Sequence, residues 1–383
     1  ELVAGEGGEK LSPQGTPVEW TVEESWFFRL SAYQDRLLAL YRDNPCFIQP
    51  DSRRNEVIRF VEGGLRDLSV SRTSFDWGVK VPGAEDHVMY VWVDALTNYL
   101  TGLGYPDLTP EMARFWPADI HLIGKDIVRF HAVYWPAFLM SAGLDLPKQV
   151  FGHGFLLNRG QKESKSLGNV TDPVELADRY GVDVLRYFLM REISFGQDGS
   201  YSPEAIVIRA NAELANSFGN LAQRTLSMIF KNRDGVLQAG LAADQADDVL
   251  LEAVRNAIIG MRAHFAELAF SEGLEAWMRG VFACNQYVDD QAPWALRKTD
   301  PDRMTAVLMV LFRCVRDLAI AVRPVVPQSA DKLLDQMGVA SAGRDFAALD
   351  DGDWFAALAA SGFRVAQPVG VFPRLELPAE SVA

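Results

Sequence analysis

The chain has 383 residues, of which 49% are hydrophobic and 23% are charged, and its formal net charge is −14. This length allows two or three domains of ordinary globular composition, and the acidic balance restricts any nucleic-acid contact to a local patch. The three cysteines form no Cys-x-x-Cys pair, which argues against a disulfide framework and a cysteine-ligated zinc site. No apolar run approaches the roughly 20 residues of a membrane span, so we expect a cytoplasmic protein without a membrane partner.

The first half of the chain predicts an α/β domain. Apolar residues recur at helical spacing in 25–43, which predicts an amphipathic helix. Strands and helices are then expected to alternate, and this pattern predicts a parallel sheet. The expected elements are a strand at 87–93, a helix at 94–104, a strand at 119–124 and a helix at 125–143.

Long helical periodicities dominate the chain from about Pro203 onward. Prolines, glycines and an acidic segment separate them, and together they predict a helical bundle as a further domain. The expected helices are 204–232, 249–268, 270–290 and 304–324. A short strand or an extended tail is expected at 370–376.

Between these two parts lies the segment RGQKESKSLGN, residues 159–169, with Lys162 and Lys165 outside any apolar periodicity. It follows the apolar stretch VFGHGFLL and precedes a helix that Asp172 can cap, with Pro173 in its first turn. Two ammonium groups between a strand and a helix suit a phosphate site, but an isolated run of this kind is more often a plain solvated loop.

The helix expected at 125–143 carries His131 on the same face as Ile127 and two aromatic residues. Spacing alone favours a core histidine, although open α/β sheets bind ligands at the carboxyl ends of their strands. The Gly-Lys-Asp turn before this helix supports a ligand site, because Gly124 permits close backbone approach and Asp126 could accept hydrogen bonds from ribose hydroxyls.

Trp92 and Tyr99 lie at a predicted strand–helix junction, either as core residues or as walls of an apolar pocket. No Ser-His-Asp or Cys-His arrangement and no acid–base pair of carboxylates is recognisable, and the histidines lack metal-ligand spacing. A hydrolytic mechanism therefore has no candidate residues.

In the predicted bundle, Asn216, Asn220, Gln223 and Arg224 share one helical face. Such a polar face is what most bundle helices present to solvent. Trp294 follows a proline at an expected helix start, near two basic residues. It could stack on a nucleotide base or form a hydrophobic staple.

Taken in order, these motifs resemble those of the class I aminoacyl-tRNA synthetases, whose second signature is a Lys-x-Ser-Lys-Ser loop, and specifically the methionyl-tRNA synthetase family. The matching segments cover nearly the whole chain: SVSR, WGVKVPG, HVMYVWVDALTNYL, HLIGKDIVRFHAVYWPAFL, GHGFLL, QKESKSLGN, YGVDVLRYFL, NSFGNLAQR and DQAPW. The resemblance implies an α/β fold, with part of a Rossmann-like parallel-sheet catalytic domain followed by an α-helical anticodon-binding bundle. The implied bounds are 1–86 for the end of a connective insertion, 87–150 for the second half of the catalytic domain, 151–215 for a stem-contact region with the lysine loop, and 216–383 for the anticodon-binding domain.

The activity that the resemblance implies is ATP-dependent activation of L-methionine to methionyl-adenylate and its transfer to tRNA(Met) with a CAU anticodon, with Mg²⁺ accompanying the nucleotide. This chemistry needs positioning and charge neutralisation rather than a protein nucleophile. The residues that match the family's methionine pocket are Trp92, Ala95, Leu96, Tyr99, Ile127 and His131. Those that match its ATP site are Gly124, Asp126, His153, Leu156, Lys162 and Lys165, and Arg72 joins the two lysines as an implied catalytic residue. Those that match its anticodon site are Asn220, Arg224 and Trp294.

The chain departs from the family pattern at four places. The His-x-Gly-His signature does not occur in it, so we expect a C-terminal portion that forms no adenylate alone. The insertion lacks the Cys and His of the family's zinc knuckle, so no zinc is expected. Leu96 stands where some relatives have proline, and Glu163 stands where methionine is usual. We expect Glu163 to point to solvent, because a carboxylate beside a triphosphate would oppose binding.

Two alternatives remain. Another class I synthetase is disfavoured, because cysteinyl relatives have zinc ligands and leucyl, isoleucyl or valyl relatives have a large editing insertion. A non-catalytic tRNA-binding fragment is physically plausible for a chain without the His-x-Gly-His half. The bundle ends without an evident dimerisation appendix, so a monomer is expected.

Overall fold

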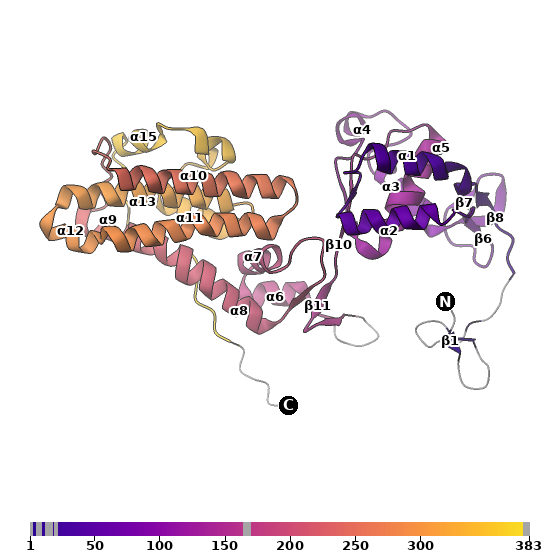
Figure 1. Ribbon diagram of the computed structural model, residues 1–383, viewed down its shortest axis with the longest axis horizontal. Coiled ribbons are helices and arrows are strands. Elements are labelled where there is room, and N and C mark those ends of the chain that lie inside the picture. The colour runs from indigo at the N-terminus through magenta and orange to yellow at the C-terminus, as the bar shows by residue number, and fades with distance from the viewer. Residues whose placement is uncertain (1–2, 5–9, 12–17, 19–21, 164–169, 378–383) are drawn as a thin grey trace. The chain divides into compact units, whose positions relative to one another are not determined.

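The computed structural model describes residues 3–4, 10–11, 18, 22–163 and 170–377 of the chain. They belong to two compact units, which we call the N-terminal unit (Glu1–His153) and the C-terminal unit (Gly154–Ala383). Each unit has its own hydrophobic core. Figure 1 shows the mixed strands and helices of the first unit and the long helices of the second.

The centre of the N-terminal unit is a three-stranded parallel sheet in the order β4-β10-β9. Val150 in the middle strand pairs with Ile48 on one side and with His121 on the other. Buried side chains of the two helices α1 and α2 pack on the apolar residues of these strands, as expected for a parallel sheet covered by helices. The bounds are β4 (Ile48–Gln49), β9 (His121–Gly124), β10 (Val150–His153), α1 (Gln34–Asp43) and α2 (Asp51–Glu62).

The prediction of a strand at 87–93 in the parallel sheet is wrong, both in the bounds of the strand and in the strands that it pairs with. It is β8 (Ala84–Met89), which lies in an antiparallel sheet with β6 (Ser71–Arg72) and β7 (Lys80–Val81). The helix α3 (Val91–Thr101) begins directly after Tyr90, so Trp92 lies in its first turn. A short apolar run carries no periodicity that separates a strand from the start of a buried helix. The parallel sheet instead takes β4 from residues before 87, although the predicted domain bounds themselves stay a prediction.

The helix predicted at 25–43 is shorter than expected. A strand, β3 (Phe27–Phe28), and a 3₁₀ turn, Leu30–Tyr33, precede α1. Leu30 is buried, as the spacing predicts, whereas Phe27 is exposed because it lies in the strand and not on the helix. The other elements of this unit are β1 (Val3–Ala4), β2 (Lys10–Leu11), β5 (Leu68–Ser69) and α4 (Pro110–Phe115).

The helix predicted at 125–143 is confirmed as one helical segment of changing pitch. It comprises a 3₁₀ turn (Lys125–Ile127), a π-helical turn (Phe130–Tyr134) and α5 (Trp135–Ala142). Pro136 at the start of α5 has no N–H to donate and its ring would crowd the carbonyl one turn earlier, which explains the wide turn before it. The segment ends at Gly143, whose φ of +70° suits glycine.

The C-terminal unit begins with a small sheet of the order β12-β11-β13. Arg159 and Gly160 both have positive φ and form the two-residue hairpin turn between β11 and β12. β13 pairs in parallel with β11. The bounds are β11 (Leu156–Asn158), β12 (Gln161–Lys162), β13 (Gly199–Tyr201), α6 (Pro173–Tyr180) and α7 (Val182–Glu192).

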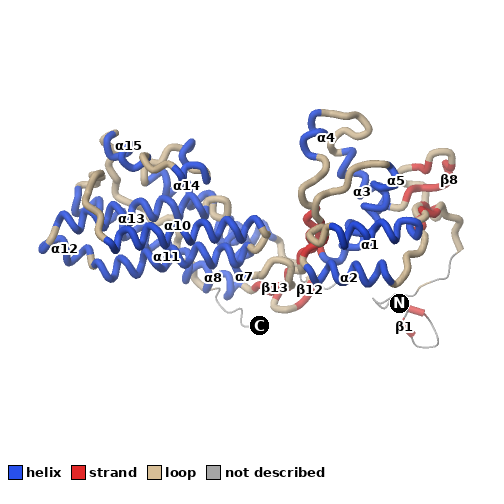
Figure 2. Tube along the Cα trace, turned by 45° about the horizontal axis from the view of Figure 1, so that its top comes forward, coloured by secondary structure: helices blue, strands red, loops and turns tan. Residues whose placement is uncertain are grey.

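The predicted bundle is confirmed, with α10, α11 and α13 lying side by side in Figures 1 and 2. Trp277 is fully buried at its centre and donates to the carbonyl of Leu318 at 3.0 Å. The helix expected at 204–232 is continuous but contains a π-helical stretch between α8 and α9. The bounds are α8 (Pro203–Arg209), the π-helical stretch (Ala210–Gly219), α9 (Asn220–Arg233), α10 (Gln245–Ala266), α11 (Phe270–Gln291), α12 (Pro293–Thr299), α13 (Pro301–Val322), α14 (Pro327–Gln336) and α15 (Trp354–Ala360).

Residues 370–376 form an extended tail and not a strand. The side chain of Asn211 holds this tail by donating to the Leu375 carbonyl at 2.9 Å and accepting from its N–H at 2.8 Å. Within the described residues, no helix is both long enough and apolar enough to cross a membrane.

Candidate active site and tRNA-contact residues

An aromatic cluster in the N-terminal unit joins α3 to the helical segment that follows β9. The Tyr99 hydroxyl lies 2.9 Å from Nε2 of His131, and Nδ1 of His131 lies 3.0 Å from the Ile127 carbonyl. Since a carbonyl can only accept, Nδ1 carries the proton and Nε2 accepts from Tyr99. The Trp92 ring lies 6.1 Å from the His131 ring, edge to face.

His121 on β9 also belongs to this cluster, although the sequence predicted no site role for it. Its ring centroid lies 4.3 Å from that of Tyr99, and its Nε2 accepts from the indole N–H of Trp135 at 3.2 Å. The sequence carries no signal for it, because the apolar Ile120 and Leu122 on either side are exposed while His121 itself is buried.

The cluster is electrically neutral near pH 7. Burial lowers the pKa of His121 to about 4, with a smaller contribution from the nearby His131. Burial also lowers the pKa of His131, against the opposing effect of its hydrogen bond to Ile127, and raises the pKa of Tyr99. An uncharged aromatic wall suits an apolar or thioether side chain better than a charged one.

The structure brings most of the predicted methionine-pocket residues together. Trp92, Ala95, Leu96 and Tyr99 follow one another at i, i+3, i+4 and i+7 on one face of α3. Ala95 is exposed on that face, whereas Leu96 is fully buried in a small core that includes Trp135. His131 is only 2% exposed and bonds to the backbone, as a core histidine would, yet its second nitrogen faces Tyr99.

Two of the predicted ATP-site residues meet at the carboxyl edge of the parallel sheet. Gly124 ends β9 and pairs in register with His153, which ends β10. A Cβ atom on Gly124 would lie 2.8 Å from Oδ1 of Asp126, so a larger residue here would displace the Asp126 carboxylate. The edge is where ligands bind to open α/β sheets. Leu156 lies on β11 of the C-terminal unit and is partly exposed.

The three predicted catalytic residues are described to different extents. The guanidinium of Arg72 lies over the ring of Tyr90 at 5.4 Å, and its Nη1 lies 3.8 Å from Oε2 of Glu23. Lys162 pairs through its backbone with Leu157 in the β11–β12 hairpin, and its side chain is not described. Lys165 lies outside the described residues.

The expectation that Glu163 points to solvent is wrong. Its Oε1 accepts hydrogen bonds from the Thr171 hydroxyl at 2.7 Å and the Tyr201 hydroxyl at 2.6 Å, and the residue is half-buried. Burial alone would raise the pKa of this carboxyl, but the two hydroxyl hydrogen bonds hold the pKa below its ordinary value. A hydroxyl-rich neighbourhood therefore satisfies the carboxylate inside the fold.

The predicted anticodon residues gather at one end of the bundle. The guanidinium of Arg224 on α9 lies 5.6 Å from the ring centroid of Trp294 on α12, and its Nη2 lies 3.8 Å from Oδ1 of Asp289. Asn220 lies one turn before Arg224 on the same face and is exposed. Trp294 remains 51% exposed, so one ring face is available for stacking. A hollow of about 230 Å³ beside Arg224 is also lined by Lys231.

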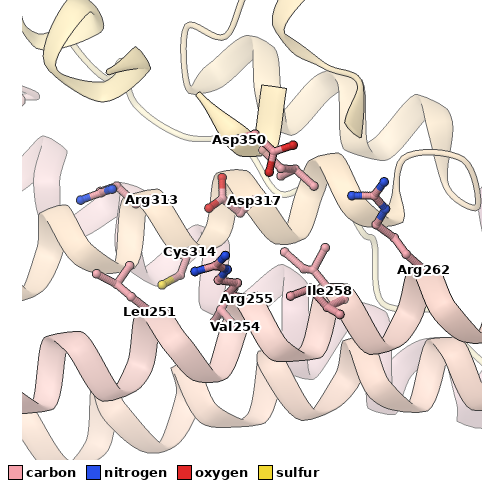
Figure 3. A pocket seen from close by; sticks show the side chains of 11 residues that line it. Leu251, Val254, Arg255, Ile258, Arg262, Arg313, Cys314, Asp317 and Asp350 are labelled. Atoms are coloured by element: carbon pink, nitrogen blue, oxygen red, sulfur yellow. The ribbon is translucent and has the colours of Figure 1, made fainter. Parts of the chain in front are cut away.

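Another hollow of the bundle, about 440 Å³ in volume, lies between α10, α13 and the 3₁₀ turn Phe346–Asp350 (Figure 3). Arg255 and Arg262 on α10 and Asp317 on α13 line it. Burial raises the pKa of Asp317, although Arg316 donates to it at 2.8 Å. None of the predicted site residues lies in this hollow.

Comparison with protein families assigns both parts of the chain. Residues 10–226, more than half of its length, match the model of class I tRNA synthetases (M). Residues 237–376 match the model of the anticodon-binding domain of methionyl tRNA ligase. The chain belongs to the methionyl-tRNA synthetase family.

Individual members of the methionyl-tRNA synthetase family are similar to this chain over nearly its whole length. The methionine–tRNA ligase of Brucella suis biovar 1 is 59% identical over 367 residues, which make up 96% of this chain and 70% of the relative. The Mycobacterium tuberculosis enzyme is 56% identical over 95% of this chain and 70% of its own length.

Solved structures of that mycobacterial methionyl-tRNA synthetase have the same fold as this chain. The crystal structure bound by methionyl-adenylate superposes with a TM-score of 0.89 at 53% identity and covers 97% of this chain and 73% of its own. The apo structure gives a TM-score of 0.90 at 52% identity, with 99% and 74% coverage. The predicted fold class, a parallel-sheet catalytic domain followed by a helical anticodon-binding domain, is confirmed. The alternative of another class I synthetase is excluded by these matches.

The comparisons do not test the expectation about zinc. Within the described residues, no three His, Cys, Asp or Glu side chains are grouped to hold a metal ion. The expectation that this member of the methionyl-tRNA synthetase family has no zinc remains a prediction from its sequence.

Proposed function

We propose that the protein carrying this chain activates L-methionine with ATP, forming methionyl-adenylate and pyrophosphate, and then transfers the methionyl group to tRNA(Met). The observation that carries the proposal is the neutral aromatic cluster around Tyr99 and His131, beside the ligand-binding edge of the parallel sheet. It is supported by the solved relative that is 53% identical and is bound by methionyl-adenylate.

The aromatic cluster is suited to the methionine side chain. Trp92 and Tyr99 present ring surfaces, and contacts between a thioether sulfur and an aromatic ring are favourable. Leu96 and Trp135 belong to a small buried core, and Trp92 packs against it. The hydrogen bond from Tyr99 to His131 holds both rings, so the shape of the pocket is fixed before the ligand arrives.

The reaction joins the methionine carboxylate to the α-phosphorus of ATP while the bond to pyrophosphate breaks. Negative charge on the phosphates must be neutralised as this happens. We assign this role to Lys162 and Lys165, with Arg72 as a further cation near the start of α3. Mg²⁺ would accompany the ATP phosphates and lend its charge to them.

The nucleotide would lie along the carboxyl edge of β9 and β10. Gly124 lets the backbone approach closely, the exposed Asp126 can accept from ribose hydroxyls, and His153 lies at the paired position of the next strand. Leu156 is included among the ATP-site residues on the family resemblance alone. In the bundle, Asn220 and Arg224 would read anticodon bases while Trp294 stacks on one of them.

The deciding experiment is methionine-dependent exchange of pyrophosphate into ATP by the full-length protein that contains this chain. We expect exchange with methionine and not with cysteine or leucine, followed by charging of tRNA(Met). Binding of tRNA without any exchange would favour the non-catalytic alternative, and exchange driven by another amino acid would overturn the proposal.

We also propose that the protein works as a monomer in the cytoplasm. Gel filtration with light scattering tests the oligomeric state, and cell fractionation tests the location.

A further inference from the structure

A hydrogen-bonded cluster surrounds Glu163, at a position where the family usually has methionine. We call it the Glu163 cluster, and it consists of Asn158, Glu163, Thr171 and Tyr201. Oε1 of Glu163 accepts from both hydroxyls, at 2.7 Å from Thr171 and 2.6 Å from Tyr201. Asn158 donates to the Thr171 hydroxyl at 3.2 Å, and the two hydroxyls also contact each other.

The Glu163 cluster joins parts of the chain that lie on either side of residues 164–169, which include Lys165. Glu163 precedes residues 164–169 and Thr171 follows them. Tyr201 lies on β13, is only 4% exposed, and is held by the pairing of β13 with β11. Both ends of the short segment are therefore fastened, through one carboxylate oxygen, to the same buried hydroxyl.

The Glu163 cluster offers the carboxylate two hydroxyl donors. Hydrogen bonds to an ionised acceptor are roughly twice as strong as those between neutral groups. A hollow of about 80 Å³ lies against Glu163 and Tyr201, with Leu176, Leu185 and Phe188 among its apolar walls. These walls offer the carboxylate no partner, so the two hydroxyls direct where it lies.

We propose that Glu163 is a positioning residue for adenylate formation. Through the Thr171 and Tyr201 hydroxyls it fastens the chain on both sides of residues 164–169 to β13. This contact sets where the adjoining Lys162 can act on the phosphates. This inference rests on the proposed function.

The test compares two tyrosine variants in the full-length protein. Tyr201→Phe removes the hydroxyl that bonds to Glu163. Tyr180→Phe is the matched control, because the described part of the chain offers no hydrogen-bond partner to that buried hydroxyl. We expect Tyr201→Phe to lower kcat of methionine-dependent exchange about tenfold, the scale of one lost charged hydrogen bond, without changing KM for methionine. Tyr180→Phe should match the parent.

Two variants of the carboxylate separate positioning from a general loss of structure. Glu163→Ala should lower kcat at least as much as Tyr201→Phe does, because it also removes the contact with Thr171. The double variant should be no slower than Glu163→Ala, since the contact that Tyr201→Phe removes is already absent from it. Glu163→Gln keeps an acceptor oxygen but not the charge, and it should recover part of the rate. Additive losses, or no recovery with glutamine, would overturn the inference.

A second readout needs no catalysis. Trypsin cleavage after Lys165 should be several-fold faster in Tyr201→Phe than in Tyr180→Phe, since the residues around the cleaved bond are identical in both variants. Equal cleavage together with equal kcat overturns the role of the Glu163 cluster. If the parent shows no methionine-dependent exchange, the proposed function fails, and equal cleavage rates would then overturn the fastening of this segment as well.

Discussion

His131 uses its two ring nitrogens for two different partners. Nδ1 donates to the Ile127 carbonyl on its own helix, and Nε2 accepts from the Tyr99 hydroxyl on another helix. The first contact is what a core histidine makes, and the second orients an aromatic ring that is partly exposed. The side chain therefore couples the packing of the helix to the shape of the candidate pocket.

Replacing His131 with alanine should raise KM for methionine about tenfold, because the Tyr99 ring loses its only described hydrogen-bond acceptor and one pocket wall disappears. Tyr99→Phe, which removes the hydrogen bond but keeps the ring, should cause a smaller rise. Pyrophosphate-exchange kinetics at varied methionine measure both. A lowered thermal midpoint with an unchanged KM would assign His131 to the core alone.

His121 should make the N-terminal unit less stable in mild acid. Burial lowers its pKa from 6.5 to about 4 in the folded state, so the unfolded chain binds more protons between these values. The free energy of unfolding that depends on neutral His121 is therefore fully present above pH 6.5 and is lost as the pH falls toward 4. At pH 5 the loss amounts to about 2 kcal/mol.

The matched variant for this prediction is His121→Gln, which can still accept from the Trp135 indole but does not titrate. Hydrogen exchange of the β9 and β10 amides reports the local opening free energy at pH 7.5 and pH 5. The parent should lose about 2 kcal/mol more than the variant between these two pH values. The same pH dependence in both proteins would contradict the assignment.

Trp294→Ala should reduce kcat/KM for tRNA charging by about 10- to 100-fold, since stacking on a base contributes about 1–3 kcal/mol. Adenylate formation should not change, because Trp294 lies in the bundle beside Arg224. Trp294→Phe keeps a stacking ring and is the control. Equal losses in pyrophosphate exchange and in charging would show that Trp294 is a structural residue.

At the scale of elements, the start of the C-terminal unit is packed without free space. A Cβ atom on Gly154 would lie 2.1 Å from the carbonyl oxygen of Gln197. The neighbouring Phe155 is fixed there, since its N–H donates to Asp198 at 2.8 Å and its carbonyl accepts from Gly199 at 3.0 Å. The approach of the two backbones is what aligns β11 with β13.

Gly154→Ala should therefore destabilise the β11–β13 sheet by about 1–3 kcal/mol, the usual range for overpacking. Hydrogen exchange of the amides of β11 and β13 measures the change. Gly370→Ala is the control, because a Cβ atom there would meet open space. Equal exchange rates in the parent and the Gly154 variant would show that the backbones can separate freely.

Elements with strong periodicity are the ones that the sequence predicts well. The long bundle helices and the helical segment after β9 follow from apolar spacing. The segment 87–93 does not, because seven consecutive residues of mostly apolar character leave the change from β8 to α3 at Tyr90 without a signal. The short strand β4 is likewise invisible in sequence, since its assignment depends on a partner about a hundred residues away.

The site shows the same division. Family motifs lead to Tyr99, His131, Arg224 and Trp294, and the structure brings each pair together. The orientation of Glu163 is missed because it depends on Tyr201, a residue of another strand. Side-chain direction set by a distant hydroxyl cannot be inferred from local pattern.

For the molecule as a whole, the net charge of −14 means that tRNA binding must rely on local cations. Arg224 and Lys231 line the hollow beside α9, next to the exposed Trp294. Their attraction for phosphates opposes a general repulsion of the polyanion, so affinity for tRNA should depend steeply on salt.

Arg224→Gln should weaken tRNA binding and reduce the slope of log affinity against log salt by up to about one unit, the share of one phosphate contact. Filter binding at several salt concentrations gives the slope. Lys332→Gln on α14, an exposed change of equal charge, is the control. If both variants shift the slope equally, the effect belongs to net charge and not to the α9 surface.

The pairing of β10 with β4 has a consequence for how the chain is made. Ile48 leaves the ribosome roughly a hundred residues before Val150, its partner in the sheet. Until then β4 and β9 have no central strand between them, and the apolar faces of α1 and α2 lack the sheet that covers them. Nascent chains that end before Val150 should therefore be targets for chaperones and proteases, whereas a few more residues, through His153, add the strand that joins β4 to β9.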